Sequence, residues 1–168
     1  PGSNHSVALA WGDYDNDGDE DLYIVSGFLD IARPANSREQ PNALLRNERN
    51  GAFVEVSTGS GADDLGIGRG GAYIDFNGDG CVDLVIANYG QTSTLLENVC
   101  DSGNHWLIVD LEGTTSNRDG IGARITVSAD GAKQIREISA ALPYPHPLAP
   151  RPEWTCASAP PGMIWTSN

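Results

Sequence analysis

Two nine-residue stretches decide the fold of this chain: Asp13-Tyr-Asp15-Asn-Asp17-Gly18-Asp-Glu-Asp21 and Asp75-Phe-Asn77-Gly-Asp79-Gly80-Cys-Val-Asp83. We refer to them as loop one and loop two. In both loops an oxygen-bearing side chain recurs at positions 1, 3, 5 and 9. Glycine holds position 6, where the backbone can turn sharply. Several hard oxygen ligands directed at one point favour calcium, so we predict two Ca²⁺ ions, one in each loop.

These loops differ from an EF-hand in two respects. An EF-hand carries a bidentate glutamate at position 12 and is flanked by helices, whereas position 12 here is Ile24 or Ile86. The flanking segments are apolar and rich in β-branched residues, which is typical of strands. We therefore expect each loop to join two β-strands. These strands are predicted at residues 7–11, 21–25, 72–74 and 83–87.

A solvated hairpin turn is the alternative interpretation, because Asp, Asn and Gly also suit turns without any metal. Two loops with the same spacing and the same glycine are harder to explain by turn chemistry alone. Loop one contributes four side-chain carboxylates, whereas loop two has the neutral Asn77 at position 3. We expect loop one to bind calcium more tightly.

The composition excludes several classes of partner. The chain has 168 residues and a formal net charge of −13, from 23 acidic and 10 basic residues. Such acidity argues against nucleic acid or an anionic membrane surface as a partner. No apolar run has the length needed to cross a bilayer, so membrane insertion is not expected. Millimolar calcium is an extracellular condition, and loops of this kind favour an extracellular or cell-surface location.

The three cysteines are Cys81, Cys100 and Cys156, and they show no spacing typical of zinc sites. Cys81 occupies position 7 of loop two, where the backbone carbonyl is the group that a metal needs. Its side chain is therefore available for another role. Two interpretations stay open: a disulfide between Cys81 and Cys100, or free, partly buried thiols.

A longer repeat surrounds the loops. Each loop is followed by a second apolar segment that ends in asparagine, Leu44-Leu-Arg-Asn47 or Leu95-Leu-Glu-Asn98. The loops are 62 residues apart (13 to 75) and these segments 51 apart (47 to 98), so the first copy has about eleven extra residues, expected between Gly27 and Gln40. Short strands and glycine-rich turns at this period predict an all-β fold of four-stranded β-propeller blades.

The stretch from Trp11 to Tyr23, the segment Pro41 to Asn47 and the stretch from Gly71 to Leu84 resemble FG-GAP/VCBS repeats. These are the calcium-binding blades of integrin-type propellers. The resemblance covers residues 6–100, with blade one at about 6–57 and blade two at about 68–100. His105 to Gly113 and Ser116 to Val127 resemble the ASPIC/UnbV segment of cartilage-acidic-protein-like sequences, which we place at residues 104–140.

The FG-GAP/VCBS resemblance implies a ligand set for each ion. The implied side-chain ligands are Asp13, Asp15, Asp17, Asp21, Asp75, Asn77, Asp79 and Asp83. The backbone carbonyls of Asp19 and Cys81, at position 7 of each loop, would complete the two sites.

The C-terminal third has its own pattern. Leu107, Val109 and Leu111 alternate with polar or exposed-type neighbours, as do Ile125 and Val127, so both segments are expected as half-buried strands of a small antiparallel β segment. Residues 116–120 between them suit a turn. Residues 141–168 form a proline-rich stretch, which we expect to be an extended tail.

These observations favour a non-catalytic, calcium-binding extracellular module for adhesion, recognition or self-assembly. The alternatives are a structural subunit of a filament or surface layer and, less favoured, an accessory part of a polysaccharide-acting enzyme. The histidines, His5, His105 and His146, are scattered, and no nucleophile or zinc motif accompanies them. Two blades cannot close a propeller. We therefore expect exposed blade faces, with a partner that is another copy of the chain or an extracellular protein or glycan. The apolar residues expected to be partly uncovered are Val7, Leu9, Ile24, Tyr73, Leu84 and Ile86.

Overall fold

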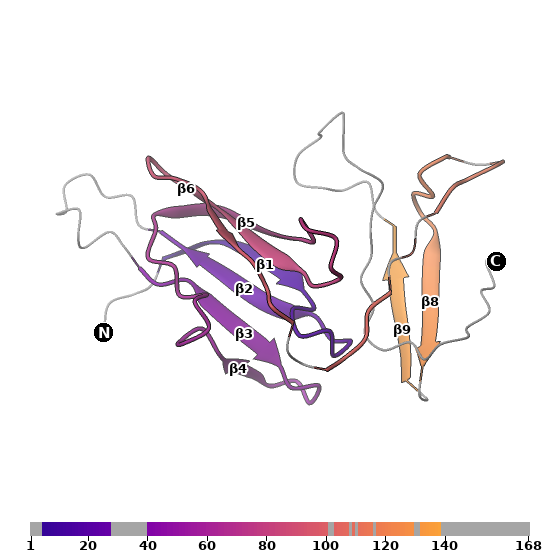
Figure 1. Ribbon diagram of the computed structural model, residues 1–168, viewed down its shortest axis with the longest axis horizontal. Helices are drawn as coiled ribbons and strands as arrows, with labels where there is room; N and C mark the ends of the chain where they lie inside the picture. Colours follow the sequence, from indigo (N-terminus) through magenta and orange to yellow (C-terminus); the bar gives the residue numbers. More distant parts are fainter. Residues whose placement is uncertain are drawn as a thin grey trace. The chain divides into compact units, whose positions relative to one another are not determined.

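The computed structural model describes residues 5–27, 40–100, 103–107, 109, 111–115, 117–129 and 132–138 (Figure 1). Every regular element in these ranges is a β-strand, and the strands form three antiparallel sheets, none of which closes on itself. Within the same ranges no helix has the length and hydropathy to span a membrane. The chain divides into two compact units, Pro1–Asp15 with Asp19–Asp101, and Asn16–Gly18 with Ser102–Asn168.

The first sheet is an antiparallel meander of four strands in sequence order. Its members are β1 (Ser6–Gly12), β2 (Asp21–Ser26), β3 (Ala43–Asn47) and β4 (Phe53–Glu55). Ala10 pairs with Tyr23, and Tyr23 pairs with Leu44, so these three side chains share one face. Loop one connects β1 to β2. The predicted four-stranded unit around loop one is confirmed.

The second sheet has three strands in sequence order, β5 (Gly68–Ile74), β6 (Asp83–Asn88) and β7 (Thr94–Leu96). Loop two connects β5 to β6. Here the prediction of a fourth strand is wrong for the described residues. In the first sheet a turn after Asn47 leads into β4, whereas after β7 the chain reaches Cys100, which is bonded back to loop two.

The same two hydrogen bonds occur at the start of both sheets. In the first sheet they run from Gly27 N–H to His5 O (3.0 Å) and from His5 N–H to Gln40 Oε1 (2.7 Å); in the second, from Tyr89 N–H to Ile67 O (2.8 Å) and from Ile67 N–H to Gln91 Oε1 (2.7 Å). Gly27 therefore corresponds to Tyr89, and Gln40 to Gln91. Twelve residues (28–39) separate the first pair and one (Gly90) the second. This difference accounts for the predicted eleven-residue insertion, which itself lies outside the described residues.

The hydrophobic core of the first unit lies between its two sheets. Tyr23, Val25 and Ile86 have no exposed surface. β5 packs against β1 and β2, as the adjacent strands in Figure 1 show. Glycine permits this close approach, because a Cβ added at Gly71 would lie 2.7 Å from Val25 Cγ2, and one at Gly12 would lie 2.5 Å from the Tyr73 ring.

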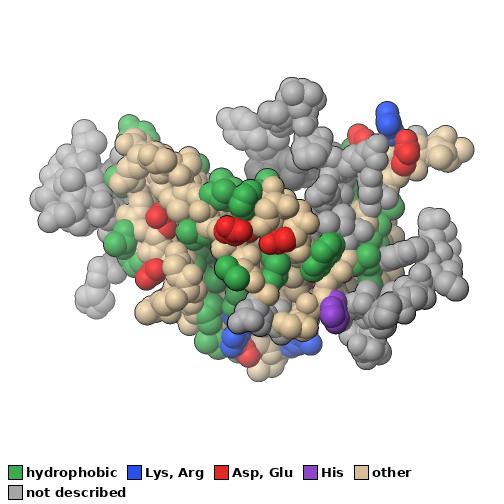
Figure 2. Space-filling model, viewed as in Figure 1, with side chains coloured by type: hydrophobic (Ala, Val, Ile, Leu, Met, Phe, Trp, Pro, Cys, Tyr) green, Lys and Arg blue, Asp and Glu red, His purple; other side chains and the backbone are tan. Residues whose placement is uncertain are grey.

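The opposite face of the first sheet is uncovered. Val7, Leu9 and Trp11 alternate along β1 with exposed fractions of 43%, 55% and 53%, and the Trp11 ring makes an edge contact with Phe53 at a centroid distance of 6.2 Å. On the side seen in Figure 2, hydrophobic side chains reach the surface of the first unit. The predicted exposed faces are therefore present in part.

For the second sheet, the prediction of an exposed face is wrong at Leu84 and Ile86. Both were expected to be partly uncovered, but Leu84 is 6% exposed and Ile86 is fully buried. They occupy the face of β6 that packs on the first sheet. The alternation of a strand identifies its two faces, but only the packing decides which face is covered.

The second unit contains a β-hairpin of β8 (Arg124–Ala129) and β9 (Ala132–Glu137). Val127 is 5% exposed and Ile125 is half-buried, which confirms the alternation predicted there. The turn expected at residues 116–120 is confirmed for its described part, since Gly120 N–H donates to Asn117 O at 3.2 Å.

The strand expected around Leu107, Val109 and Leu111 is absent from the described residues of that segment. These three residues are half-buried, as their alternation predicts, but they belong to no strand. A strand requires a neighbouring backbone that completes its hydrogen-bond ladder, and alternation alone cannot supply one. The proline-rich stretch at residues 141–168 lies outside the described residues.

The glycine contacts generate a stability prediction. Gly71→Ala should destabilise the fold by about 1–3 kcal/mol, because the new methyl group overlaps Val25 in a packed core. Gly70→Ala is the matched control, since a Cβ there meets nothing within 4 Å. Urea unfolding of the two variants measures the difference. Equal stabilities would contradict the close packing of the two sheets.

Candidate metal-binding loops

Both loops adopt the same backbone conformation. Positive φ angles occur at position 4, in Asn16 (54°) and Gly78 (74°), and at position 6, in Gly18 (98°) and Gly80 (84°). The position-6 glycine was predicted from the sequence, and the turn at position 4 was not. Its signal is the Asn or Gly at that position, since these residues adopt positive φ most readily.

The ninth residue of each loop is a fully buried carboxylate held by two backbone N–H groups. Asp21 accepts the N–H of Tyr14 at 3.1 Å and that of Asn47 at 2.8 Å. Asp83 makes the matching pair: its carboxylate accepts the N–H of Phe76 at 3.1 Å and the N–H of Asn98 at 2.8 Å. Each carboxylate thereby ties its loop to the end of the third strand of its sheet.

Loop one gathers three acids at one point. Oxygen atoms of Asp13, Asp15 and Asp21 all lie within 4.8 Å of one another, and we call this group the loop-one triad. Burial, followed by the nearby carboxylates of Asp15 and Asp13, raises the pKa of Asp21 to about 7, although the N–H bonds from Asn47 and Tyr14 act to lower it. Crowded, partly buried carboxylates of this kind suit a hard divalent cation.

Two of the predicted loop-one ligands are not members of this triad. Asp17, expected as a side-chain ligand, is absent from it. Asp19 was expected to contribute its carbonyl, and its side chain forms an ion pair with Arg49 at 2.7 Å. The side chain of Asp19 is therefore engaged away from the triad, and its carbonyl role stays a prediction.

The acids of loop two are held by the loop's own donors. Asp75 accepts the N–H groups of Gly78 (2.8 Å), Asp79 (3.2 Å) and Gly80 (3.0 Å). The Asp79 carboxylate accepts the N–H of Cys81 at 2.8 Å and an amide hydrogen of Asn77 at 2.9 Å. Among the described residues only the loop-one triad meets the 4.8 Å spacing. Carboxylate oxygens have further lone pairs, so the loop-two donor set still suits calcium.

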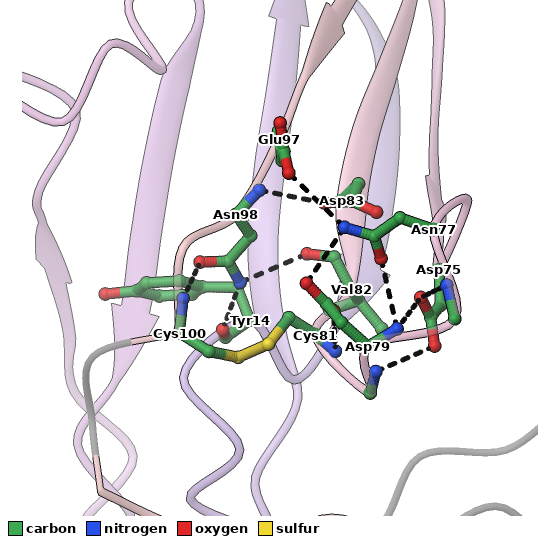
Figure 3. Close-up of a disulfide and its surroundings, with 12 residues drawn as sticks. Tyr14, Asp75, Asn77, Asp79, Cys81, Val82, Asp83, Glu97, Asn98 and Cys100 are labelled. Atoms are coloured by element: carbon green, nitrogen blue, oxygen red, sulfur yellow. Dashed lines mark hydrogen bonds between the residues drawn. A yellow bond between two sulfur atoms is a disulfide. The ribbon is translucent and has the colours of Figure 1, made fainter.

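Figure 3 shows the disulfide between Cys81 of loop two and Cys100. Their Cα atoms are 5.8 Å apart, within the range that a disulfide requires. Of the two interpretations left open by the sequence, the structure has the bridged form. The bond fixes position 7 of loop two to the segment that follows β7.

Repeat one has an ion pair at the place where repeat two has this disulfide. Asp19 and Cys81 both occupy position 7 of their loops, and Arg49 and Cys100 both lie two residues after the asparagine that ends the apolar segment. Arg49 and Cys100 also share a positive φ, 60° and 35°. The Asp19–Arg49 ion pair and the Cys81–Cys100 disulfide are therefore equivalent cross-links. Sequence reasoning missed Arg49, although its spacing from Asn47 identifies it.

Asn47 and Asn98 also organise the loops, a role that sequence reasoning did not assign to them. The side-chain amide of Asn47 donates to Glu20 O, and that of Asn98 donates to Val82 O, each at 3.2 Å. Glu20 and Val82 both hold position 8 of their loops. The signal was present in the repeated Leu-Leu-x-Asn pattern, which marks the same structural position twice.

Comparison with known proteins identifies part of the chain. A family model described as ASPIC and UnbV matches residues 113–144. Cartilage acidic protein 1 of Xenopus tropicalis is 46% identical over 64 residues, which cover 38% of this chain and 10% of that protein. The mouse protein of the same name is 48% identical over 50 residues, or 29% of this chain and 8% of its own length.

The human protein of that name is 46% identical over 50 residues, again 29% of this chain and 8% of that protein. The chain thus spans about a tenth of the length of the curated relatives it matches. These matches support the ASPIC/UnbV segment expected at residues 104–140. They leave the resemblance of residues 6–100 to FG-GAP/VCBS repeats as a prediction.

The two equivalent cross-links should differ in strength. Removing the disulfide with Cys81→Ala and Cys100→Ala should cost about 3 kcal/mol, because the bond closes a loop of 19 residues in the unfolded chain. Arg49→Ala should cost less than about 1 kcal/mol, since its ion pair is solvent-exposed. Chemical denaturation measures both values, and non-reducing peptide mapping checks the Cys81–Cys100 pairing. An unbridged pair in the oxidised, folded protein would contradict the assignment.

Proposed function

We propose that this chain is a non-catalytic, calcium-binding extracellular module for recognition, adhesion or self-assembly. The observation that carries the proposal is the loop-one triad of Asp13, Asp15 and Asp21, whose oxygens converge within 4.8 Å. Calcium takes six to eight oxygen ligands, and the loop supplies carboxylates together with backbone carbonyls. The ligand set is the one stated from the sequence, with loop two as the second and weaker site.

Calcium acts here as a folding ligand. Three carboxylates held close together repel one another, and a divalent cation converts this repulsion into attraction. Two ions would change the formal charge from −13 to −9, since −13 plus 4 is −9. Because the ninth-position carboxylates hold the third strands, ordering of the loops extends into both sheets. Any partner surface on these sheets then depends on calcium by linkage.

Three observations support an extracellular location. The Cys81–Cys100 disulfide is stable in oxidising compartments. Millimolar extracellular calcium suits the two loops. The matched relatives carry the name cartilage acidic protein 1, and this chain is also acidic, with a formal net charge of −13.

A non-catalytic role fits the chemistry of the described residues. The acids that converge in loop one are those that a cation would occupy. His5 and His105 are exposed side chains, and His146 lies outside the described part of the chain. Catalytic acids, bases and nucleophiles usually lie in a cleft, whereas His5 and His105 lie at exposed positions.

The uncovered face of the first sheet favours self-assembly as the form of recognition. Val7, Leu9 and Trp11 expose between 43% and 55% of their surface along one strand, and Phe53 extends the same apolar area. Contiguous apolar area on a sheet face marks an interaction site. Under this proposal the two sheets act as propeller-type blades, and a further sheet, from another copy or another protein, covers the exposed face.

The first test removes one carboxylate from the triad. In calcium, Asp15→Asn should lower the melting temperature relative to the unchanged protein, because the ion loses a charged ligand. In excess chelator the same change should raise it, because the repulsion between Asp15 and Asp21 is relieved. Calcium at a hundred times Kd should add about 2.7 kcal/mol to the unchanged protein. Thermal unfolding in calcium and in chelator measures both effects.

Glu20→Gln is the matched control. It removes the same charge from the same loop, but Glu20 is exposed and is not a member of the triad. It should leave the stabilisation by calcium nearly unchanged. If calcium stabilises the Asp15→Asn variant as much as the unchanged protein, the triad is not the calcium site.

A second test addresses assembly. Sedimentation velocity at micromolar concentration in calcium should detect self-association, and Leu9→Lys should weaken it by placing a charge on the apolar face. Leu65→Lys is the control, because Leu65 is also 55% exposed but lies outside the sheets. A compact monomer that resists protease, with no effect of Leu9→Lys, would refute the assembly role.

A further inference from the structure

A path of hydrogen bonds connects the two loops through Asn98 (Figure 3). Asp21 Oδ2 accepts the N–H of Tyr14 at 3.1 Å, and the Tyr14 carbonyl accepts the side-chain amide of Asn98 at 2.6 Å. The backbone N–H of Asn98 donates to Asp83 Oδ1 at 2.8 Å. The path begins on the ninth-position carboxylate of loop one and ends on that of loop two, and both carboxylates are fully buried.

Comparison with Asn47 shows which contact is particular to Asn98. Both asparagines donate a backbone N–H to the ninth-position carboxylate and a side-chain amide hydrogen to the eighth-position carbonyl of their own loop. An asparagine amide has two hydrogens to donate. Asn98 uses the second on Tyr14, 84 residues away in sequence, and Asn47 makes no counterpart of this bond within the described ranges.

Asn98 is held firmly enough to transmit a displacement. Its side-chain oxygen accepts the N–H of Cys100 at 3.2 Å, and Cys100 is covalently bonded to Cys81 at position 7 of loop two. A shift of loop two therefore acts on Asn98 through Asp83, Val82 and the disulfide together. In loop one, Asn98 donates to the Tyr14 carbonyl.

We propose that Asn98 couples the two loops, so that a cation bound in one raises the affinity of the other. The inference rests on the calcium binding proposed above. Asp13 and Asp15, the residues on either side of Tyr14, would hold a cation in loop one, and the Tyr14 peptide between them would thereby be fixed. A fixed Tyr14 carbonyl orders Asn98, and the N–H of Asn98 positions Asp83. A second cation would then bind a loop that is already ordered, so its binding would lose less conformational entropy. The effect is reciprocal, because each site changes the affinity of the other by the same factor.

The test is a thermodynamic cycle measured by calorimetric titration of calcium into the full chain. The affinity of loop one is determined with loop two intact and with loop two weakened by Asp79→Asn, a change at an exposed position. The pair of measurements is repeated in the Asn98→Ala background. Asn47→Ala is the matched control, because it removes the same contacts within its own repeat and leaves the Tyr14 bond in place.

With Asn98 present, the Asp79→Asn change should reduce the calcium affinity of loop one by about 5-fold or more. A factor of about 5 is at the lower end of typical coupling between sites. In the Asn98→Ala background the reduction should fall below about 2-fold, and in the Asn47→Ala background it should persist. Equal coupling with and without Asn98 would overturn the assignment of the relay to this residue. Two independent sites in the unchanged protein would overturn the coupling and leave the calcium proposal standing. Absence of any calcium binding would overturn both.

Hydrogen exchange gives a second readout that does not require the Asn98→Ala variant to fold. In the Asp79→Asn protein, calcium bound in loop one should slow exchange of the Asn98 N–H, whose acceptor is Asp83. It should also slow exchange of the Phe76 N–H on the other oxygen of Asp83. Protection confined to the amides of loop one would contradict the relay.

Discussion

The first unit depends on one kind of interaction: backbone N–H groups hydrogen-bond to the buried carboxylates of Asp21 and Asp83. Each carboxylate accepts one N–H from the start of its own loop and one from the residue that follows or ends the third strand. A loop, a hairpin and a third strand are thus joined at one charged group that water does not reach. Such a group is costly to bury without compensation. The two N–H bonds supply part of that compensation, and under the proposed function a cation would supply more. Under the proposed function, one residue of each repeat would serve both the fold and the metal site.

The two repeats cross-link the same positions by different chemistry. The Asp19–Arg49 ion pair is exposed and sensitive to salt, whereas the Cys81–Cys100 disulfide is covalent and sensitive to reductant. Repeat one has more carboxylates and keeps its cross-link reversible. Repeat two has Asn77 where repeat one has Asp15, and its acids Asp75 and Asp79 accept hydrogen bonds from the loop itself. The less charged loop is the one that the covalent bond supports.

Packing assigns the two faces of each sheet to different roles. Glycines at positions 12 and 71 bring the sheets close enough to bury Tyr23, Val25 and Ile86 between them. The opposite face of the first sheet keeps its apolar side chains exposed, which suits a module that is completed by another sheet. The ASPIC and UnbV match, at residues 113–144, belongs to the second unit.

The sequence by itself determined the strand-loop-strand units, the place of the insertion and the hairpin strand at Ile125 and Val127, because these depend on local spacing and alternation. It also indicated the acids that we propose as metal ligands. Only the tertiary structure decided which acids converge, so that Asp13, Asp15 and Asp21 form a triad while Asp17 lies outside it. It also decided that Leu84 and Ile86 are buried, that the described residues Leu107, Val109 and Leu111 belong to no strand, and that Cys81 is bonded to Cys100. The burial of Leu84 and Ile86 requires side chains from the other sheet. The convergence of the triad depends on how the loop folds around Asp21, which Asn47, 26 residues away, helps to hold. The bond from Asn98 to Tyr14, 84 residues away, is the clearest case, because no local pattern specifies which carbonyl the second amide hydrogen will meet.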